Sequence, residues 1–237
     1  MLPRYESKIQ EIQSMLAKLI SEVLEAHLKA LSAYKNHNVV QPKELNTQRS
    51  NRKTDEFDDV KGILKTIQAE ANAIDNEIVK TFALFGPEAQ ELRLLISYLK
   101  MTNELIRIGE GTKKYARRMK EHCESDCNLE SLDDIIIKLH SSSIAAIQFI
   151  ADCFNNHEEC NYEDLYRSVM VEESKCDDLL SILEKEILSR IIIEGELSIE
   201  YVRILSTLRK LERASDHAIN IAKLMLYSKD GGEIQSY

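Results

Sequence analysis

Apolar residues recur at intervals of three and four along most of the chain, which is the period of an α-helix with one buried face. The turn Gly86-Pro87 and the residue Gly195 mark helix ends, since glycine suits a C-terminal cap and proline the first turn of the next helix. With only 7 glycines and 3 prolines in 237 residues, little else interrupts the helices, so we expect an all-α fold. The pattern predicts six long helices over residues 3–35, 56–85, 87–121, 129–155, 161–193 and 196–228.

The expected helices fall into two groups of three. Residues 1–122 hold the first group and residues 123–237 the second, with a short acidic turn at 121–128. Self-similarity at a fixed offset marks an internal repeat, so the pattern predicts two tandem three-helix bundles. The third and sixth helices align at an offset of 106 residues, with identities at Leu105 and Leu211, Arg107 and Arg213, Ala116 and Ala222, and Met119 and Met225.

Residues 36–55 interrupt the helical pattern. The segment is polar, contains Pro42, and is basic within an acidic chain because of Lys43, Arg49, Arg52 and Lys53. A connection of this length is long for a compact bundle. Two interpretations of the basic loop 37–55 stay open: a solvated loop, or an arm that contacts an acidic partner surface.

Charge and hydropathy narrow the class of protein. A net charge of −9 and a pI near 5.3 argue against a general nucleic-acid binder, which needs a basic face. The basic run at residues 113–120 ends the third helix, where cations favour the helix dipole, so it needs no partner to explain it. No stretch reaches the roughly 18 apolar residues of a membrane span. Residues 1–6 also lack the apolar core of a signal peptide, so we expect a cytoplasmic protein without a transmembrane segment.

The five cysteines are expected to be reduced thiols, because no secretion signal accompanies them. Cys123 with Cys127, and Cys153 with His157 and Cys160, each offer too few ligands for a closed zinc site. A helix of about 25 residues separates the two sets by roughly 35 Å, so they cannot combine.

The sixth helix carries an acid pair beside its apolar face. Glu212 and Asp216 are four residues apart, so they lie on one side of the helix. Like charges at this spacing repel by about 0.2–0.5 kcal/mol. Either the acids form a solvated helix edge with Arg209 and Arg213 as counter-charges, or a cation lies between the carboxylates. Hard cations prefer such oxygen ligands.

Residues 211–222 read Leu-Glu-Arg-Ala-Ser-Asp-His-Ala-Ile-Asn-Ile-Ala, which resembles the signature of the PhoU family of phosphate-uptake regulators. Residues 92–100 and the opening residues 1–6 also resemble members of that family. The family architecture is two three-helix repeats, so the resemblance covers most of the chain and agrees with the predicted fold. In that family an acid-x-x-x-Asp motif recurs on paired helices and binds metal clusters.

The resemblance implies a metal site in the second repeat. The family's second acidic motif lies on the middle helix of each repeat, and Glu173 and Asp177 match it on the fifth helix. With Glu212 and Asp216 they would form a site of four carboxylates, provided that the two helices face each other. Carboxylates this close raise one another's pKa and call for a cation. The expected cofactor is iron or another divalent or trivalent transition metal.

The first repeat departs from the motif. Glu110 stands where Asp216 does, but Ile106 matches Glu212. On the second helix Asp75 matches Asp177, in a register that stays open by one turn, and an alanine replaces Glu173. We therefore predict that the first repeat, through Asp75 and Glu110, binds metal weakly or not at all.

The resemblance implies a regulator and not an enzyme. Family members are adaptors that link a phosphate ABC transporter ATPase to a sensor histidine kinase and dampen phosphate-starvation signalling when phosphate is plentiful. Such partners would hold the protein at the inner membrane, and homodimers are common in the family. The alternatives are a metal-free helical adaptor, a PhoU-like accessory of another phosphate carrier, and a ferritin-like metal enzyme. The enzyme is disfavoured because none of the 6 histidines has a glutamate three positions before it.

Overall fold

The structure is a computed structural model that describes residues 3–38, 50–123, 129–157 and 159–231, together with residues 125 and 127. No strand occurs within these ranges, and the predicted all-α class is confirmed. The α-helices are α1 (Pro3–Asn38), α2 (Ser50–Ile63), α3 (Ile67–Phe85), α4 (Ala89–Cys123), α5 (Asp133–Asn155), α6 (Tyr162–Ile193) and α7 (Ser198–Asp230). Two 3-10 turns, η1 (Glu130–Leu132) and η2 (Gly195–Leu197), precede α5 and α7.

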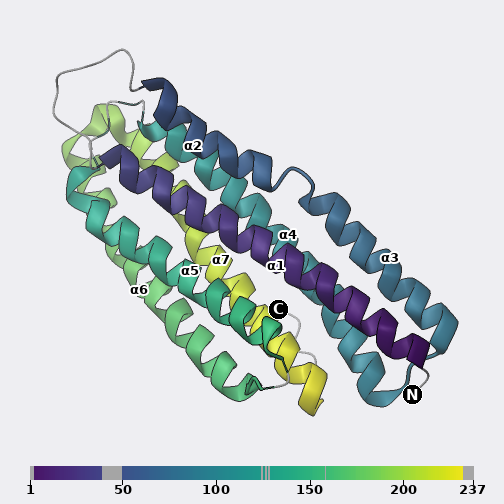
Figure 1. The fold of residues 1–237 in the computed structure, drawn as a ribbon. Coiled ribbons are helices and arrows are strands. Elements are labelled where there is room, and N and C mark those ends of the chain that lie inside the picture. Colours follow the sequence, from purple (N-terminus) through teal and green to yellow (C-terminus); the bar gives the residue numbers. More distant parts are fainter. Residues whose placement is uncertain are drawn as a thin grey trace.

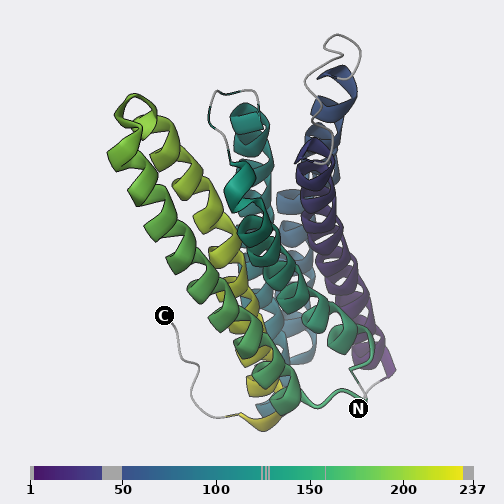
Figure 2. The same ribbon diagram turned by 90° about the vertical axis from the view of Figure 1, so that its left-hand side faces the viewer.

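The helices lie side by side in one elongated bundle (Figure 1). α4 and α7 make the most extensive contact, α6 packs on α5 and α7, and α2 and α3 pack on α1 and α4. A second view shows α6 and α7 as a long hairpin along one side of the bundle (Figure 2). α4 and α7 run antiparallel, because Glu104 contacts His217 whereas His122 contacts Glu200.

The predicted second helix is two helices. α2 ends at Ile63 and α3 begins at Ile67, and α2 starts at Ser50, inside the segment expected to be a loop. The fully buried Leu64 and Ile67 keep helical spacing across the break, so the apolar pattern gives no sign of it. Gly62 lies just before the break, where a glycine disfavours helix by about 1 kcal/mol relative to alanine.

The basic loop 37–55 falls largely outside the described part of the chain. Residues 39–49 are not described, and of residues 50–55 only the backbone, as the start of α2, is described. Both interpretations of the basic residues at 43, 49, 52 and 53 therefore stay predictions.

The positions that match between the third and sixth helices have the same role in the packing. Each apolar identity on α4 has a buried counterpart on α7, as expected if the two helices are equivalent members of a repeat. Their side chains are between 0% and 3% exposed, at Leu105, Ala116, Met119, Leu211, Ala222 and Met225.

Two predicted helix ends are confirmed. Gly86 follows α3 with φ 54°, in the left-handed region that glycine adopts at little cost, and its N–H donates to the carbonyl of Phe82. Asn161 caps α6, because its side chain accepts hydrogen bonds from the N–H groups of Glu163 and Asp164.

The expectation of reduced thiols is wrong at one pair. Cys153 in the last turn of α5 and Cys160 just before α6 form a disulfide, with Cα atoms 5.3 Å apart. The short turn between α5 and α6 brings the two residues within the range of separations that a disulfide spans. The expectation rested on the cellular compartment and not on geometry, so it could not anticipate this pairing.

α5 is the one described helix that is long and apolar enough to cross a membrane by length and composition. With η1 it covers Glu130–Asn155 at a mean hydropathy of 1.2, and 50% of that window is buried inside the bundle. α5 contacts α1, α6 and α7. Packing on three neighbours accounts for its apolar composition.

Candidate metal centre

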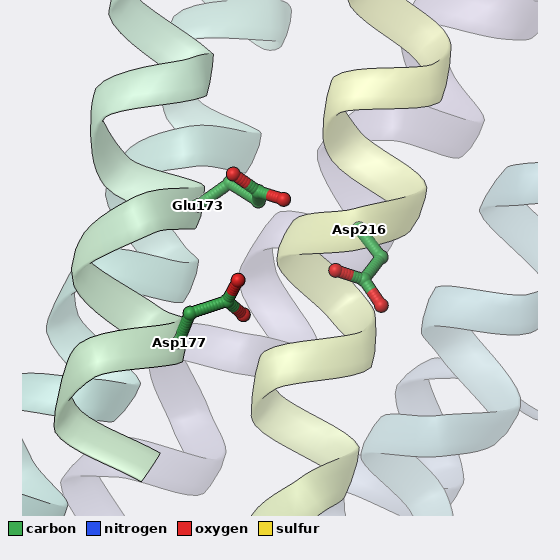
Figure 3. A group of neighbouring side chains, drawn as sticks. All are labelled: Glu173, Asp177 and Asp216. Atoms are coloured by element: carbon green, nitrogen blue, oxygen red, sulfur yellow. The ribbon is translucent and has the colours of Figure 1, made fainter. Parts of the chain in front are cut away.

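Three of the four predicted carboxylates of the second repeat converge between α6 and α7. Glu173 and Asp177 project from α6 toward Asp216 on α7 (Figure 3). One carboxylate oxygen from each of the three residues lies within 4.8 Å of the other two. The helices can hold this arrangement because Glu173 and Asp177 lie one turn apart on the α6 face that packs on α7.

Glu212, the fourth predicted ligand, lies beside this group rather than within it. Burial, followed by the charges of Asp216 and Asp177, raises the pKa of Glu212 to about 7. Arg213 and Arg209 oppose this shift only in part. Glu212 is therefore close enough for the charges of both aspartates to affect it, and in the absence of a cation it is partly protonated near neutral pH.

Two other acids of the site, Asp216 and Glu173, also have raised pKa values. Burial, and then the charge of Asp177, raises the pKa of Asp216. Burial, followed by Asp177 and Asp216, raises the pKa of Glu173. None of the ion pairs formed by described residues includes any of these four carboxylates.

The donor set suits a hard cation. All the converging atoms are carboxylate oxygens, which hard divalent and trivalent ions prefer. The neighbouring thiol of Cys176 is buried, faces the carbonyl of Leu139, and has its pKa raised to about 12 by burial. The thiol points to that carbonyl and is not a member of the converging group. The carboxylates would therefore hold a metal without help from sulfur.

The first repeat does not bring its two predicted ligands together. Asp75 on α3 accepts a hydrogen bond of 2.7 Å from Thr102, whereas Glu110 forms an ion pair of 2.7 Å with Lys113. Thr102 and Glu110 are eight residues apart on α4, which is about 12 Å along a helix. The register of α3 on α4 thus places Asp75 two turns from Glu110, more than the single turn left open by the sequence.

Apolar packing fills the corresponding place in the first repeat. Ile67 on α3 lies against Gly109 on α4 so closely that a Cβ at Gly109 would meet its Cδ1 atom. Ile106, one turn from Glu110, is partly buried against the core. No group of three metal-ligating side chains forms in the first repeat, as far as it is described.

His27 and His217 are not members of the converging carboxylate group. His27 is fully buried and contacts Thr112 at 2.6 Å, and burial lowers its pKa to about 4, so it is a packed neutral histidine. His217 Nδ1 lies 2.7 Å from Glu104 on α4, away from the carboxylate group.

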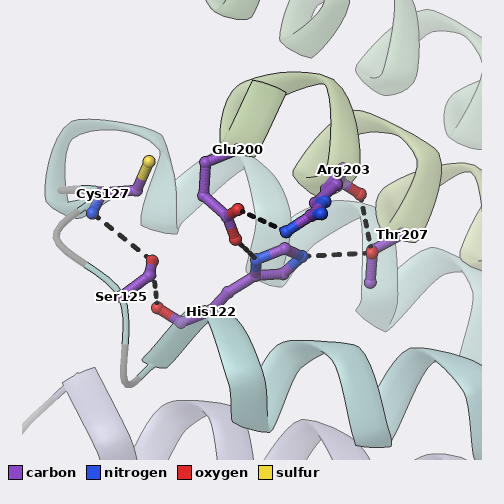
Figure 4. A network of polar contacts seen from close by, with 6 residues as sticks. All are labelled: His122, Ser125, Cys127, Glu200, Arg203 and Thr207. Atoms are coloured by element: carbon purple, nitrogen blue, oxygen red, sulfur yellow. Dashed lines mark hydrogen bonds and ion pairs between the residues drawn. The ribbon is translucent and has the colours of Figure 1, made fainter. Parts of the chain in front are cut away.

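Sequence reasoning missed a polar network that joins the end of α4 to the start of α7 (Figure 4). His122 Nδ1 lies 2.9 Å from Glu200, and His122 Nε2 lies 3.2 Å from Thr207. Arg203 donates to the same Glu200 carboxylate at 3.3 Å. The network ties the last turn of the first repeat to the second, and no spacing along the chain could reveal it because the partners are 78 or more residues apart.

The comparisons with known proteins agree with this architecture. The PhoU domain family model matches the chain twice, at residues 16–119 and 136–225. A Pseudomonas aeruginosa protein named as a phosphate-specific transport system accessory protein PhoU homolog is 32% identical over 170 residues, covering 71% of this chain and 67% of its own length. A Thermotoga maritima protein of the corresponding name, PhoU homolog 1, is 27% identical over 172 residues, covering 69% and 68% of the two chains.

Solved structures show the same fold. The crystal structure of PhoU from Pseudomonas aeruginosa superposes with a TM-score of 0.79 at 25% identity, covering 96% of this chain and 100% of that one. The phosphate transport system regulatory protein PhoU from Streptococcus pneumoniae gives a TM-score of 0.77 at 18% identity, covering 98% and 100%.

Fold and comparisons together define a class of helical-bundle proteins in which one domain family occurs twice along the chain, and the matched relatives are named as accessory or regulatory proteins and not as enzymes. The chain belongs to the PhoU family. The resemblance seen in residues 211–222 is thereby confirmed.

Proposed function

We propose that this protein is an accessory regulator of phosphate uptake. The match of the PhoU family model to both halves of the chain carries the proposal. The names of relatives at up to 32% identity, which refer to a phosphate-specific transport system, support it. The protein would act in the cytoplasm, at the inner face of the membrane when bound to its partners.

The finer role that we propose is that of an adaptor. It would link the ATPase of a phosphate ABC transporter to a sensor histidine kinase and would repress the phosphate-starvation response when phosphate is plentiful. Long helices with exposed faces, such as those of α3 and α6, offer the wide surfaces that helical partners need.

This role is tested by deleting the gene and measuring expression from a promoter that phosphate starvation induces. Expression should become high in phosphate-rich medium and should be repressed again when the full chain is supplied. Unchanged repression in the deletion strain would contradict the regulatory role. Pull-down of the transporter ATPase but not the kinase would support a carrier accessory instead of an adaptor. Light scattering of the purified chain would test the homodimer expected from the resemblance.

We further propose that Glu173, Asp177 and Asp216, with Glu212 beside them, hold iron or another divalent or trivalent transition metal. The convergence of the three carboxylates within 4.8 Å supports the proposal. The ion would supply fixed positive charge that joins α6 to α7. The group contains no histidine and none of the Glu-x-x-His pairs of ferritin-like enzymes, so a binding role is favoured over redox catalysis.

Titration of metal-free protein with Mn2+ and Fe2+ under anaerobic conditions tests the site. Saturable binding without turnover of oxygen would support the regulator with a bound metal. Absence of binding would favour the metal-free adaptor, and oxygen consumption would favour the enzyme.

A further inference from the structure

α4 and α7 present a row of cations along their line of contact, which we call the cationic seam. On α4 its residues recur at helical spacing, so they share one face, and the same holds on α7. The members are Arg107, Lys114 and Arg118 on α4 and Lys210 and Arg213 on α7. Arg107, Lys114 and Arg213 are exposed, and Arg118 and Lys210 are half-buried.

Contacts between the helices show that the two rows face each other. Arg118 donates to the hydroxyl of Ser206 on α7 at 3.4 Å. Gly111, which lies between Arg107 and Lys114 on the same face, is next to the backbone of Lys210, and a Cβ there would lie 3.9 Å from the Lys210 carbonyl oxygen. These contacts, and the effect of Lys114, Arg118 and Arg213 on Lys210, place the cations of both helices along one line of contact between α4 and α7.

The neighbouring cations of α4 are neutralised, whereas those of the seam are not. Lys113 pairs with Glu110 and Lys120 pairs with Asp58, each at 2.7 Å. By contrast, the ion pairs of the described residues include no member of the cationic seam. Longer-range charge interactions are present: the carboxylate of Glu104 interacts with Arg107, and those of Glu212 and Asp216 interact with Arg213.

The nearby positive charges affect the pKa of the half-buried Lys210. Its pKa is lowered by burial and then by the charges of Arg213, Lys114 and Arg118. In a chain with a net charge of −9, four cations placed around one point keep an electrostatic cost that an anion would remove.

We propose that the cationic seam binds an anion that carries two or more phosphate groups. A phosphate group has three oxygens that point in different directions, so it can accept hydrogen bonds from cations on both helices at once. A carboxylate offers only two oxygens in one plane, which suits a single arginine fork. The seam runs from residue 107 to residue 118, roughly 16 Å at ~1.5 Å per residue, which exceeds what one phosphate can contact. This site goes beyond the regulatory role and does not depend on the metal centre.

Calorimetric titration of the full chain with inorganic tripolyphosphate tests the proposal. The protein is first treated with chelator and dialysed, so that metal bound by the probe contributes no heat. The test variant is K114Q/K210Q and the matched control is K138Q/K185Q, which removes the same two positive charges from exposed sites on α5 and α6. We expect saturable binding by the wild type and the control, and a loss of at least about tenfold in affinity in the test variant, since hydrogen bonds to charged groups are lost.

Further probes separate phosphate recognition from charge alone. Binding should weaken as salt is raised, and orthophosphate should bind more weakly than tripolyphosphate. A glutamate peptide of matched charge and vesicles with anionic lipid should bind more weakly still. K114Q/K210Q should melt at no lower temperature than the wild type, because the change removes like charges that repel. If it melts lower, the exposed single change K114Q is used in its place.

Several results would overturn the proposal. These are an absence of saturable tripolyphosphate binding near 0.15 M salt, or an equal loss in the control variant. Equal affinity for orthophosphate would exclude a site for several phosphates. Affinity for the glutamate peptide or the vesicles equal to that for tripolyphosphate would assign the seam to an acidic protein or a membrane surface instead.

Discussion

The pairs α3–α4 and α6–α7 hold equivalent places in the two repeats, yet their contacts have opposite chemistry. Between α6 and α7 three carboxylates converge within 4.8 Å. Between α3 and α4, Ile67 instead packs closely against Gly109, and Asp75 accepts a hydrogen bond from Thr102. In the first repeat the equivalent helices pack together without converging carboxylates. Among the described residues, a group of carboxylates that could hold a metal is therefore confined to the second repeat.

The largest expected difference between the repeats is in metal affinity. The variant D177N/D216N should lose at least about a hundredfold in affinity for Mn2+, because losing even a residue that only orients a ligand costs about 10–100-fold. The matched variant D75N/E110Q in the first repeat should bind as the wild type does. Titration calorimetry measures both, and equal losses in the two variants would remove the distinction between the repeats.

Placing a carboxylate in the first repeat should not convert it into a metal centre. I106E should lower the free energy of unfolding by about 2–3 kcal/mol, because the partly buried site offers the charge no partner. I106Q, similar in size but uncharged, should cost less. Denaturant unfolding with and without Mn2+ measures both effects, and rescue of I106E by metal would show that the register of α3 permits a second site.

The glycine contact in the first repeat can be tested with two alanine substitutions on one helix. G109A should lower the free energy of unfolding by about 1–3 kcal/mol, because its Cβ meets the fully buried Ile67. G111A, where a Cβ makes only ordinary contact, should raise it by up to about 1 kcal/mol through helix propensity. Equal effects in urea unfolding would argue against close packing of α3 on α4.

The smallest effect concerns the pH dependence of the metal-free protein. The folded-state pKa of Glu212 is raised to about 7, above that of the unfolded chain, so the folded state binds more protons between pH 4.5 and 7. Stability from this group is present at low pH and is lost as pH rises to about 7.

The variant E212Q should therefore be more stable than the wild type at pH 8 by about 1–2 kcal/mol, after allowance for partial exposure, and equally stable near pH 4. The difference between the two proteins cancels the contribution of His27, because that residue is present in both. The lowered pKa of His27 makes the stability rise with pH, opposite to the effect of Glu212. A difference that does not depend on pH would show that Glu212 is not strained by its neighbours.

The helices and the core could be predicted from the sequence because burial follows the apolar period. The acid pairs at 173 and 177 and at 212 and 216 could be placed because each pair lies within one helix. The break between α2 and α3 could not, because Leu64 and Ile67 continue the apolar period through it. The position of Asp75 opposite Thr102 could not be predicted for a related reason, since it depends on the axial position of α3 relative to α4.

The basic run of α4 also shows that contacts between helices could not be predicted from the sequence. Its charges were attributed to the helix dipole, which depends only on position along one helix. The structure divides the run: Lys113 and Lys120 have carboxylate partners, whereas Lys114 and Arg118 face cations of α7. The Glu110–Lys113 pair is local, three residues apart on one helix, whereas the surroundings of Lys114 and Arg118 depend on α7, about a hundred residues away, and leave no local signal.

Metal analysis by mass spectrometry of tag-free protein, purified without chelator, tests the central claim most directly. We predict near-stoichiometric or multinuclear metal in the wild type and in D75N/E110Q, and loss of that metal in D177N/D216N. Metal-free wild-type protein, or metal that persists in D177N/D216N, would contradict a carboxylate metal centre between α6 and α7.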